Sequence, residues 1–311
     1  MLFDGDKEIT TDPQKMADLL QAQFTSVFSD PNAPNVTDPS FPPPSVQHPQ
    51  ELPHFDISDE DIITAISSIP SSSASGPDGV PAILLKNCAK ELCRPIKMIG
   101  EESFTSGVVP KFYKETNITP LFKKGDRAKA VNYRPVALTS LVIKIYERVL
   151  RKNMVDFIEK NQLLCDNQHG FRSGRSCLTQ LLSHVDDIVQ GLVKNADTDA
   201  IYLDFAKAFD KVDHRLLLLK MERMGFHRSL VKWIESFLSE REQRVVLDGV
   251  SSLAAIILSG VPQGTVIGPL LFIIFINDMQ LCVTGSIIRF FADDTRILRH
   301  IFNMVDTEIL H

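Results

Sequence analysis

The sequence has few of the features that mark secreted, membrane-spanning or zinc-binding proteins. Its five cysteines form no Cys-x-x-Cys pair, which argues against a zinc knuckle and a disulfide framework. The first six residues include two acids and no base, so no secretory signal is recognisable. The apolar run at residues 270–276 is far shorter than the ~20 residues that a bilayer-spanning helix needs. These absences predict a reduced intracellular protein with no membrane partner.

Basic residues are scarce in one part of the chain and concentrated in another, although the net charge is −6. Residues 1–80 contain thirteen acids and two bases, whereas residues 111–175 contain fourteen Lys and Arg against six acids. Any single lysine in this block is most simply a solvated surface charge. The block as a whole predicts a basic face that suits a nucleic-acid partner.

The length of 311 residues allows one large domain or two smaller ones. Eight prolines in residues 31–53 indicate a linker or an extended strap. Residues 71–79, rich in Ser and Gly, are predicted to form a loop.

Hydrophobic periodicity predicts an α/β fold. Helical spacing occurs at residues 9–28, 58–69, 83–107, 140–161, 179–194, 214–224, 229–240 and 269–279. Strand-like runs occur at residues 117–122, 132–138, 198–205, 243–247, 253–258, 286–292 and 295–301. Asp12-Pro13 is a start signal for the first helix, and Ser58 is the expected N-cap of the second. Strands separated by helices indicate a sheet covered on one side.

Two adjacent acids, Asp293 and Asp294, interrupt the apolar run at residues 287–298. Ionised carboxylates among apolar residues must be paired, hydrogen-bonded or bound to a cation, and two together repel each other unless a cation lies between them. A third acid, Asp204, lies in a similar run at residues 200–205. If the two strands are neighbours, the three acids converge into a site for a hard divalent metal. Taken alone, the Asp293-Asp294 pair fits a polar turn equally well.

Such a site suits nucleotide polymerisation. Two-metal catalysis needs oxygen ligands that hold two ions about 3.5–4 Å apart, one to activate a hydroxyl and one to neutralise the leaving pyrophosphate. Mg²⁺ takes a few carboxylates together with water and substrate phosphates. Asp204, Asp293 and the backbone carbonyl of Phe205 are sufficient ligands, with Asp294 in support. Mn²⁺ is the alternative ion.

A polar loop at residues 259–265 places a glycine on either side of Gln263, just before an apolar helix. Glycine lets the backbone approach a ligand closely, and the amide of Gln263 offers both a donor and an acceptor. A Gly/Pro loop before a helix is also common where no ligand binds.

Basic residues form a further group. Lys123, Lys124 and Arg134 lie on a predicted hairpin, and two more arginines follow at residues 170–175. Lysine and arginine above a metal site can clamp a triphosphate. For Arg127 and Lys129, ordinary surface charge is the simpler interpretation.

Three motifs carry a resemblance to a known family. Residues 202–210 (YLDFAKAFD), 260–264 (GVPQG) and 291–294 (FADD) resemble, in this order, motifs A, B and C of reverse transcriptases. Phe291 stands where many relatives carry Tyr, a change that removes one hydroxyl.

Upstream motifs narrow the resemblance. Residues 75–79 (SGPDG), 132–138 (NYRPVAL) and 168–172 (QHGFR) are similar to the finger motifs of non-LTR retrotransposon enzymes. The jockey-like and chicken-repeat-like branch fits best. The resemblance covers residues 55–300, and residues 12–29 look like that family's spacer between endonuclease and polymerase.

The resemblance implies a right-hand polymerase fold, with an antiparallel palm sheet backed by helices. It implies that Asp204, Asp293 and Asp294 are the catalytic aspartates. Asp204, Asp293 and the carbonyl of Phe205 would bind two Mg²⁺ ions. Phe209 matches the aromatic steric gate that excludes a ribose 2′-OH.

Two further groups of residues take their roles from the resemblance. Gln263, Gly264, Arg134, Lys123 and Lys124 match nucleotide-binding positions, the two lysines being alternatives for one register. The expected template- and primer-binding residues are Gly170, Phe171, Arg172 and Arg175.

The resemblance also implies a domain order. Residues 1–54 are expected to be a spacer with a short helix and a proline-rich linker. Residues 55–195 are expected to be the fingers with the start of the palm helices, and residues 196–311 the palm. Because the chain ends at His311, soon after motif C, we expect a fingers–palm fragment whose thumb is missing.

We therefore expect an enzyme, the RNA-directed DNA polymerase domain of a non-LTR retrotransposon. It would add dNTPs to a primer 3′-OH on an RNA template, with template RNA, a DNA primer at the target site and dNTPs as partners. The expected location is a cytoplasmic ribonucleoprotein and the nucleus. The alternative is a catalytically inactive truncated remnant with residual RNA binding. A maturase-like RNA-folding factor is a weaker third interpretation, because no extra RNA-binding domain follows.

Overall fold

The chain forms two compact units. The computed structural model describes residues 1–4, 8–29, 56–303 and 306. The first unit comprises Met1–Phe157 and Phe209–Gly268, and the second comprises Ile158–Ala208 and Pro269–His311. Within the described residues, no helix combines the length and the apolar character needed to cross a bilayer. The proline-rich segment at residues 31–53 lies outside the described residues.

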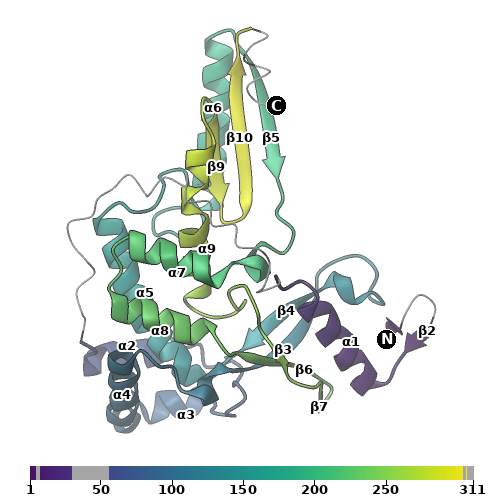
Figure 1. The fold of residues 1–311 in the computed structure, drawn as a ribbon, viewed down its shortest axis with the longest axis vertical. Helices are drawn as coiled ribbons and strands as arrows, with labels where there is room; N and C mark the ends of the chain where they lie inside the picture. Colours follow the sequence, from purple (N-terminus) through teal and green to yellow (C-terminus); the bar gives the residue numbers. More distant parts are fainter. Residues whose placement is uncertain (5–7, 30–55, 304–305, 307–311) are drawn as a thin grey trace. The chain divides into compact units, whose positions relative to one another are not determined.

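The first unit contains a mixed sheet of parallel and antiparallel strands. Its strands are β3 (Glu115–Phe122), β4 (Tyr133–Leu138), β6 (Glu242–Leu247), β7 (Val250–Ser251) and β8 (Ala255–Ile256). The order is β4-β3-β6-β7 (Figure 1). β8 also pairs with β6. β3 runs antiparallel to β4 and parallel to β6, so the predicted hairpin at residues 117–138 is confirmed.

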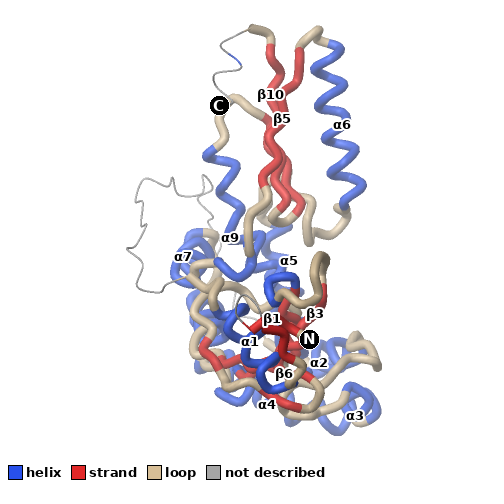
Figure 2. The backbone as a smooth tube through the Cα atoms, turned by 90° about the vertical axis from the view of Figure 1, so that its right-hand side faces the viewer, coloured by secondary structure: helices blue, strands red, loops and turns tan. Residues whose placement is uncertain are grey.

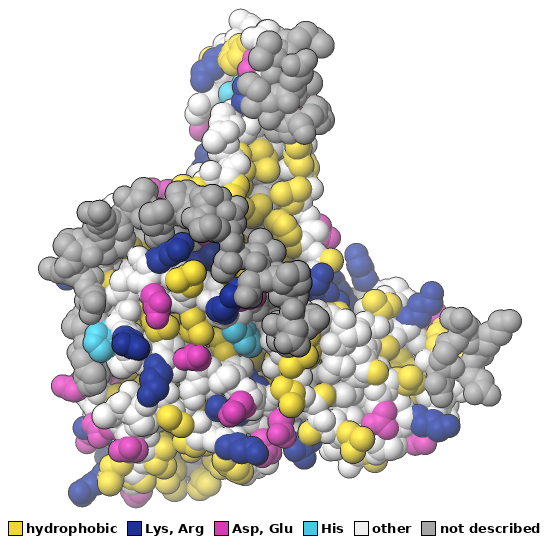
Figure 3. All heavy atoms as spheres, in the orientation of Figure 1, with side chains coloured by type: hydrophobic (Ala, Val, Ile, Leu, Met, Phe, Trp, Pro, Cys, Tyr) yellow, Lys and Arg dark blue, Asp and Glu magenta, His cyan; other side chains and the backbone are white. Residues whose placement is uncertain are grey.

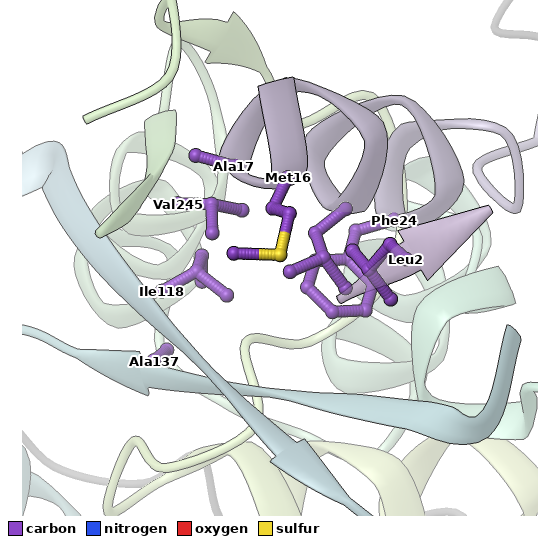
Figure 4. Packing of buried hydrophobic residues seen from close by; sticks show 8 residues of the cluster. Leu2, Met16, Ala17, Phe24, Ile118, Ala137 and Val245 are labelled. Carbon is purple, nitrogen blue, oxygen red and sulfur yellow. The ribbon is translucent and has the colours of Figure 1, made fainter. Parts of the chain in front are cut away.

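The first helix packs on this sheet. β1 (Leu2–Asp4) pairs with β2 (Glu8–Thr10), and α1 (Pro13–Thr25) follows. Asp12 caps α1 by accepting the Gln14 amide at 3.0 Å, which confirms the predicted start signal. The prediction of helix from residue 9 is wrong, because residues 8–10 pair as a strand. Buried side chains of α1 contact apolar side chains of β3 and β6, as the labelled residues in Figure 4 show.

The described part of the first unit contains further helices. They are α2 (Asp59–Ser67), α3 (Ala82–Asn87), α4 (Ala89–Ser106), α5 (Leu141–Lys160), α7 (His214–Arg223) and α8 (Arg228–Leu238), with short 3₁₀ turns η1 (Lys111–Lys114), η2 (Ala130–Asn132) and η3 (Ala208–Lys211). Ser58 caps α2, as the sequence predicts, and Asp61 completes a reciprocal capping box with it. The single helix expected at residues 83–107 is instead two helices, because Cys88 leaves helical geometry at φ −109° and ψ 27°.

The second unit is a three-stranded antiparallel sheet with helices. Its elements are α6 (Cys177–Val193), β5 (Asp197–Leu203), α9 (Gly268–Ile276), η4 (Asn277–Cys282), β9 (Ile287–Phe291) and β10 (Asp294–Ile301). The strand order is β5-β10-β9, with antiparallel pairing on both sides of β10. Figure 2 shows α6 running alongside these strands. Mixed helix and sheet in both units agrees with the predicted α/β class.

Helix α6 presents polar side chains to the sheet. Asp187 accepts two hydrogen bonds of 2.8 Å from the guanidinium of Arg289 on β9, and His184 lies 3.2 Å from the hydroxyl of Tyr202 on β5. Exposed apolar side chains on α6 are Leu178, Leu181, Leu182, Val185, Val189, Leu192 and Val193. Amphipathic spacing alone predicts the opposite orientation, because apolar faces usually turn to the core.

Candidate active site

The two adjacent acids lie at the end of the β9–β10 hairpin. Phe291 pairs with Asp294, so Ala292 and Asp293 form the two-residue turn between the strands. Asp294 is exposed and Asp293 is half-buried. The polar-turn interpretation of this pair is therefore correct as local geometry, and it does not conflict with a metal site.

Asp204 reaches the same end of the sheet from the neighbouring strand. In the antiparallel register of β5 and β10, Leu203 lies opposite Thr295. Asp204 follows Leu203 and Asp294 precedes Thr295, so these two acids flank the same end of the strand pair. Asp204 is exposed, as is Phe205 after it. The structure thus shows that the two strands are neighbours, which could only be assumed from the sequence.

These acids have the chemistry of a site for a hard cation. Carboxylate and backbone carbonyl oxygens are the ligands that Mg²⁺ and Mn²⁺ take in proteins. Two acids from adjacent strand ends, with the carbonyl of Phe205 next to one of them, fit this donor set. Among the described residues, however, no three His, Cys, Asp or Glu side chains converge closely enough to enclose an ion by themselves. Carbonyl, water and substrate oxygens would have to complete the coordination.

The segment at residues 168–172 lies against this hairpin. A Cβ added at Gly170 would lie 2.4 Å from the amide nitrogen of Ala292, so the two backbones are in direct contact. Phe171 is 44% exposed and has a φ of 58°. The exposed Phe171 thus directly follows a residue that contacts the turn.

Arg172 in this segment and Arg175 just after it have protein partners. The Arg172 guanidinium binds both carboxylate oxygens of Glu159, at 3.1 and 2.8 Å, and its side chain is 7% exposed. Arg175 forms an ion pair of 3.1 Å with Asp166. Arg172 therefore stabilises the segment, and its role in template binding stays a prediction.

In the first unit, the 259–264 loop is joined to two other segments. Gln263 accepts the Ala137 amide at 2.8 Å through its carbonyl oxygen, and its side-chain amide donates to Asp210 at 3.2 Å. The Val261 amide donates to the carbonyl of Phe209 at 2.9 Å. These bonds bring the segments of Gln263 and Phe209 together, and their binding of one nucleotide stays a prediction.

Gly264 is required by this packing. Its φ is 110°, and an added Cβ would lie 2.7 Å from the carbonyl oxygen of Ala137. Any other residue would strain the backbone and collide with β4.

The predicted triphosphate-binding cations lie on the β3–β4 hairpin. Arg134 is on β4 opposite Leu121, while Lys123 and Lys124 are in the connecting loop. All three are exposed, and none forms an ion pair with a described residue. Figure 3 shows several Lys and Arg side chains at this end of the sheet. Exposed cations that have no ion-pair partner in the described part of the chain can bind an anionic ligand.

Sequence reasoning missed two supporting acids, Asp210 and Glu147. The fully buried carboxylate of Glu147 accepts the amides of Val266 and Ile267, at 2.5 and 3.0 Å, just before α9. Burial raises the pKa of Glu147, although both hydrogen bonds oppose that shift. Its signal in the sequence is an acid inside the apolar stripe of residues 140–161.

Comparison with known proteins decides the family. The family described as "Reverse transcriptase (RNA-dependent DNA polymerase)" matches residues 122–300, more than half of the chain. This chain belongs to the reverse transcriptase family. The match contains all three aspartates and the 259–264 loop, so the predicted family is confirmed.

Individual relatives come from retrotransposons. The chain is 30% identical over 256 residues to the probable RNA-directed DNA polymerase from transposon BS of Drosophila melanogaster, which covers 79% of this chain and 28% of that protein. It is 29% identical over 255 residues to the RNA-directed DNA polymerase from mobile element jockey of the same fly, with the same coverage. A Pol polyprotein from the type-1 retrotransposable element R2 of Popillia japonica is 27% identical over 183 residues, 58% of this chain and 25% of that protein. This reverse transcriptase domain thus spans about 28% of the length of its jockey and BS relatives.

Proposed function

We propose that the chain is the catalytic part of an RNA-directed DNA polymerase from a non-LTR retrotransposon. It would join a dNTP to a primer 3′-OH on an RNA template. The primer hydroxyl would lose its proton to solvent and its oxygen would bond to the α-phosphorus. The bond from the α-phosphorus to the oxygen that bridges it to the β-phosphorus would break, and pyrophosphate would leave. The placement of Asp204 and Asp294 at one end of β5 and β10 supports this function best.

Asp204, Asp293 and the carbonyl of Phe205 would hold two Mg²⁺ ions, with Asp294 nearby. Bound there, the ions would lower the pKa of the primer hydroxyl and neutralise charge on the leaving pyrophosphate. The hairpin turn fixes where the acids lie. The fold of the second unit would therefore set the direction in which the carboxylates point toward the ions.

The first unit would select and bind the nucleotide. The ring of Phe209 would exclude a ribose 2′-OH, and Gln263 with Gly264 would contact the templating base and the incoming nucleotide. Lys123 or Lys124, with Arg134, would bind the triphosphate through charge-assisted hydrogen bonds. The bonds that join Gln263 to Asp210 and Ala137 support this assignment.

The wider setting follows from the substrates. We propose a right-hand arrangement of fingers (residues 55–195) and palm (residues 196–311), with Gly170, Phe171, Arg172 and Arg175 near the template–primer. Element RNA as template and target DNA as primer would place the protein in a cytoplasmic ribonucleoprotein and in the nucleus.

Primer extension tests this function. The full chain is incubated with an RNA template, an annealed DNA primer, dNTPs and Mg²⁺, and extension is compared in Asp293→Ala and in Asp156→Ala, an exposed acid on α5. We expect Asp293→Ala to abolish extension and Asp156→Ala to leave it unchanged. Full activity in Asp293→Ala would refute the metal assignment. No extension by the unmodified chain, with RNA binding retained, would favour the inactive remnant.

A further inference from the structure

The turn that carries Asp293 is hydrogen-bonded to a residue that lies outside the β9–β10 hairpin. Ala292, the first residue of the turn, has a φ of 55°, a region that residues other than glycine rarely adopt. Such a conformation persists where surrounding contacts impose it. The contact here is a hydrogen bond of 3.0 Å from the Ala292 amide to Oε1 of Gln168.

The same oxygen of Gln168 binds a second backbone group. The Gly170 amide donates to Oε1 at 2.8 Å, so both lone pairs of one carbonyl oxygen are used. Gln168 is 3% exposed, and water therefore has little access to replace either bond. One buried side-chain amide links the 168–170 segment to the turn with the acids.

The position of Gln168 is itself fixed by β9. The Phe290 amide donates to the carbonyl of Asn167 at 3.0 Å, and the His169 amide donates to the carbonyl of Phe290 at 2.9 Å. These two bonds place Gln168 beside Phe290 in a parallel bridge. The backbone of Gln168 thus cannot shift without breaking hydrogen bonds to the strand that leads into the turn.

Glycine at position 170 makes this approach possible. An added Cβ would lie 2.4 Å from the Ala292 nitrogen and 3.0 Å from Oε1 of Gln168. Any side chain at this position would separate the amide oxygen of Gln168 from the turn. Gly170 therefore leaves room for Ala292 to approach, and Gln168 accepts the hydrogen bond from its amide.

We propose that Gln168 is a positioning residue for the active-site aspartates. Its amide oxygen sets the conformation of the Ala292-Asp293 turn, and so the direction of the Asp293 and Asp294 carboxylates at the end of the sheet. Gln168 acts through Ala292 and needs no contact with substrate. The inference rests on the proposed function, because the direction of these carboxylates matters through the divalent cation that they bind.

Cation affinity gives a readout that is independent of polymerisation. Mn²⁺ binding to the full chain is measured by electron paramagnetic resonance of the free ion, in unmodified protein, Asp293→Ala, Gln168→Met and Gln168→Glu. Methionine keeps the side-chain length and removes the oxygen, whereas glutamate keeps the acceptor. Gln180→Met is the matched control, because Gln180 is a buried glutamine of α6 in the same unit. Amide exchange in a peptide covering residues 288–296 reports on the turn itself.

We expect Gln168→Met to raise the Kd for Mn²⁺ about 10-fold or more, as is usual when support around a metal ligand is lost, and to speed amide exchange in the turn. Gln168→Glu should restore both properties, and Gln180→Met should change neither. If Gln168→Met does not fold, Gln168→Asn replaces it, because its shorter side chain cannot reach the two donors.

Two results would overturn the inference in different ways. Mn²⁺ binding that Asp293→Ala abolishes, with Kd and exchange unchanged in Gln168→Met, would refute the role of Gln168 and leave the proposed function standing. No Mn²⁺ binding that depends on Asp293 in the unmodified chain would refute the metal assignment, and the positioning role with it.

Discussion

The side-chain amide of Gln263 donates a hydrogen bond of 3.2 Å to a carboxylate oxygen of Asp210. The bond joins the 259–264 loop to the segment that directly follows Phe209. The side chain of Gln263, a proposed nucleotide contact, is therefore held by an acid that the sequence did not single out.

Replacing Asp210 should impair nucleotide binding more than folding. In Asp210→Ala the amide of Gln263 loses its partner, and misplacement of a binding group costs up to about 10²-fold in kcat/KM. We expect the loss mainly in the KM for dNTP, measured by steady-state primer extension. Asp213→Ala is the control, because Asp213 caps α7 and its loss should cost about 1 kcal/mol of stability without changing KM. Equal KM values in the two variants would contradict the prediction.

Variants of the two lysines should identify which one, in the β3–β4 loop, binds the triphosphate of the dNTP. A hydrogen bond to a charged group contributes about 1.5–3 kcal/mol, so removing the correct lysine should raise the KM for dNTP roughly 10-fold or more. Lys123→Ala and Lys124→Ala are compared separately by primer extension, since one of the two registers is expected to dominate. Lys129→Ala, an exposed lysine nearby, should have no effect. A similar small change in all three variants would indicate a general effect of surface charge.

The buried carboxylate of Glu147 should make stability depend on pH. Its pKa is raised in the folded state by burial, so the folded chain holds the proton more tightly than the unfolded chain does. This contribution to stability is complete below the unfolded pKa of about 4.3 and is lost as the pH rises through the higher folded value. Glu147→Gln keeps an oxygen for the amides of Val266 and Ile267 and carries no charge.

Urea unfolding between pH 5 and pH 8 measures this effect. The free energy of unfolding of Glu147→Gln, relative to the unmodified chain, should increase as the pH rises. Glu222→Gln, an exposed glutamate in the last turn of α7, should show no such trend. Glu147→Leu should be destabilised at every pH, by about 1–3 kcal/mol for each amide left unpaired. A constant difference between Glu147→Gln and the unmodified chain would contradict the assigned pKa shift.

Loss of the Asp187–Arg289 ion pair should loosen α6 from its sheet. Asp187 is buried and binds Arg289 through two hydrogen bonds of 2.8 Å. Removing one partner of a buried pair leaves the other charge uncompensated, at a cost of about 3–5 kcal/mol. Hydrogen exchange should therefore become faster along α6 in Asp187→Ala. Asp186→Ala, which changes the exposed neighbouring acid, is the control, and its free energy of unfolding should stay within about 0.5 kcal/mol of that of the unmodified chain. Equal destabilisation in Asp187→Ala and Asp186→Ala would mean that the Asp187–Arg289 pair contributes little to stability.

Local features of the fold were predictable because their causes are local. The caps at Asp12 and Ser58 and the β3–β4 hairpin each depend on residues close together in the chain. The strand at residues 8–10 and the break at Cys88 were missed, because pairing with β1 and the separation of α3 from α4 involve more than helical spacing. The orientation of α6 was also not predictable, since polar partners on β5 and β9 override its apolar spacing.

By itself, the sequence determined the family, because each motif is a short contiguous run. The same motifs contain the three aspartates proposed to be catalytic and most of the residues proposed to bind nucleotide. Only the tertiary structure decided that Asp204 and Asp294 share one end of a strand pair and that Gln168 binds the turn that carries Asp293. Gln168 and Ala292 are 124 positions apart, and Glu147 and Val266 are 119 apart. A hydrogen bond across such a separation forms when the packed fold brings donor and acceptor together, so no local pattern of residues encodes it.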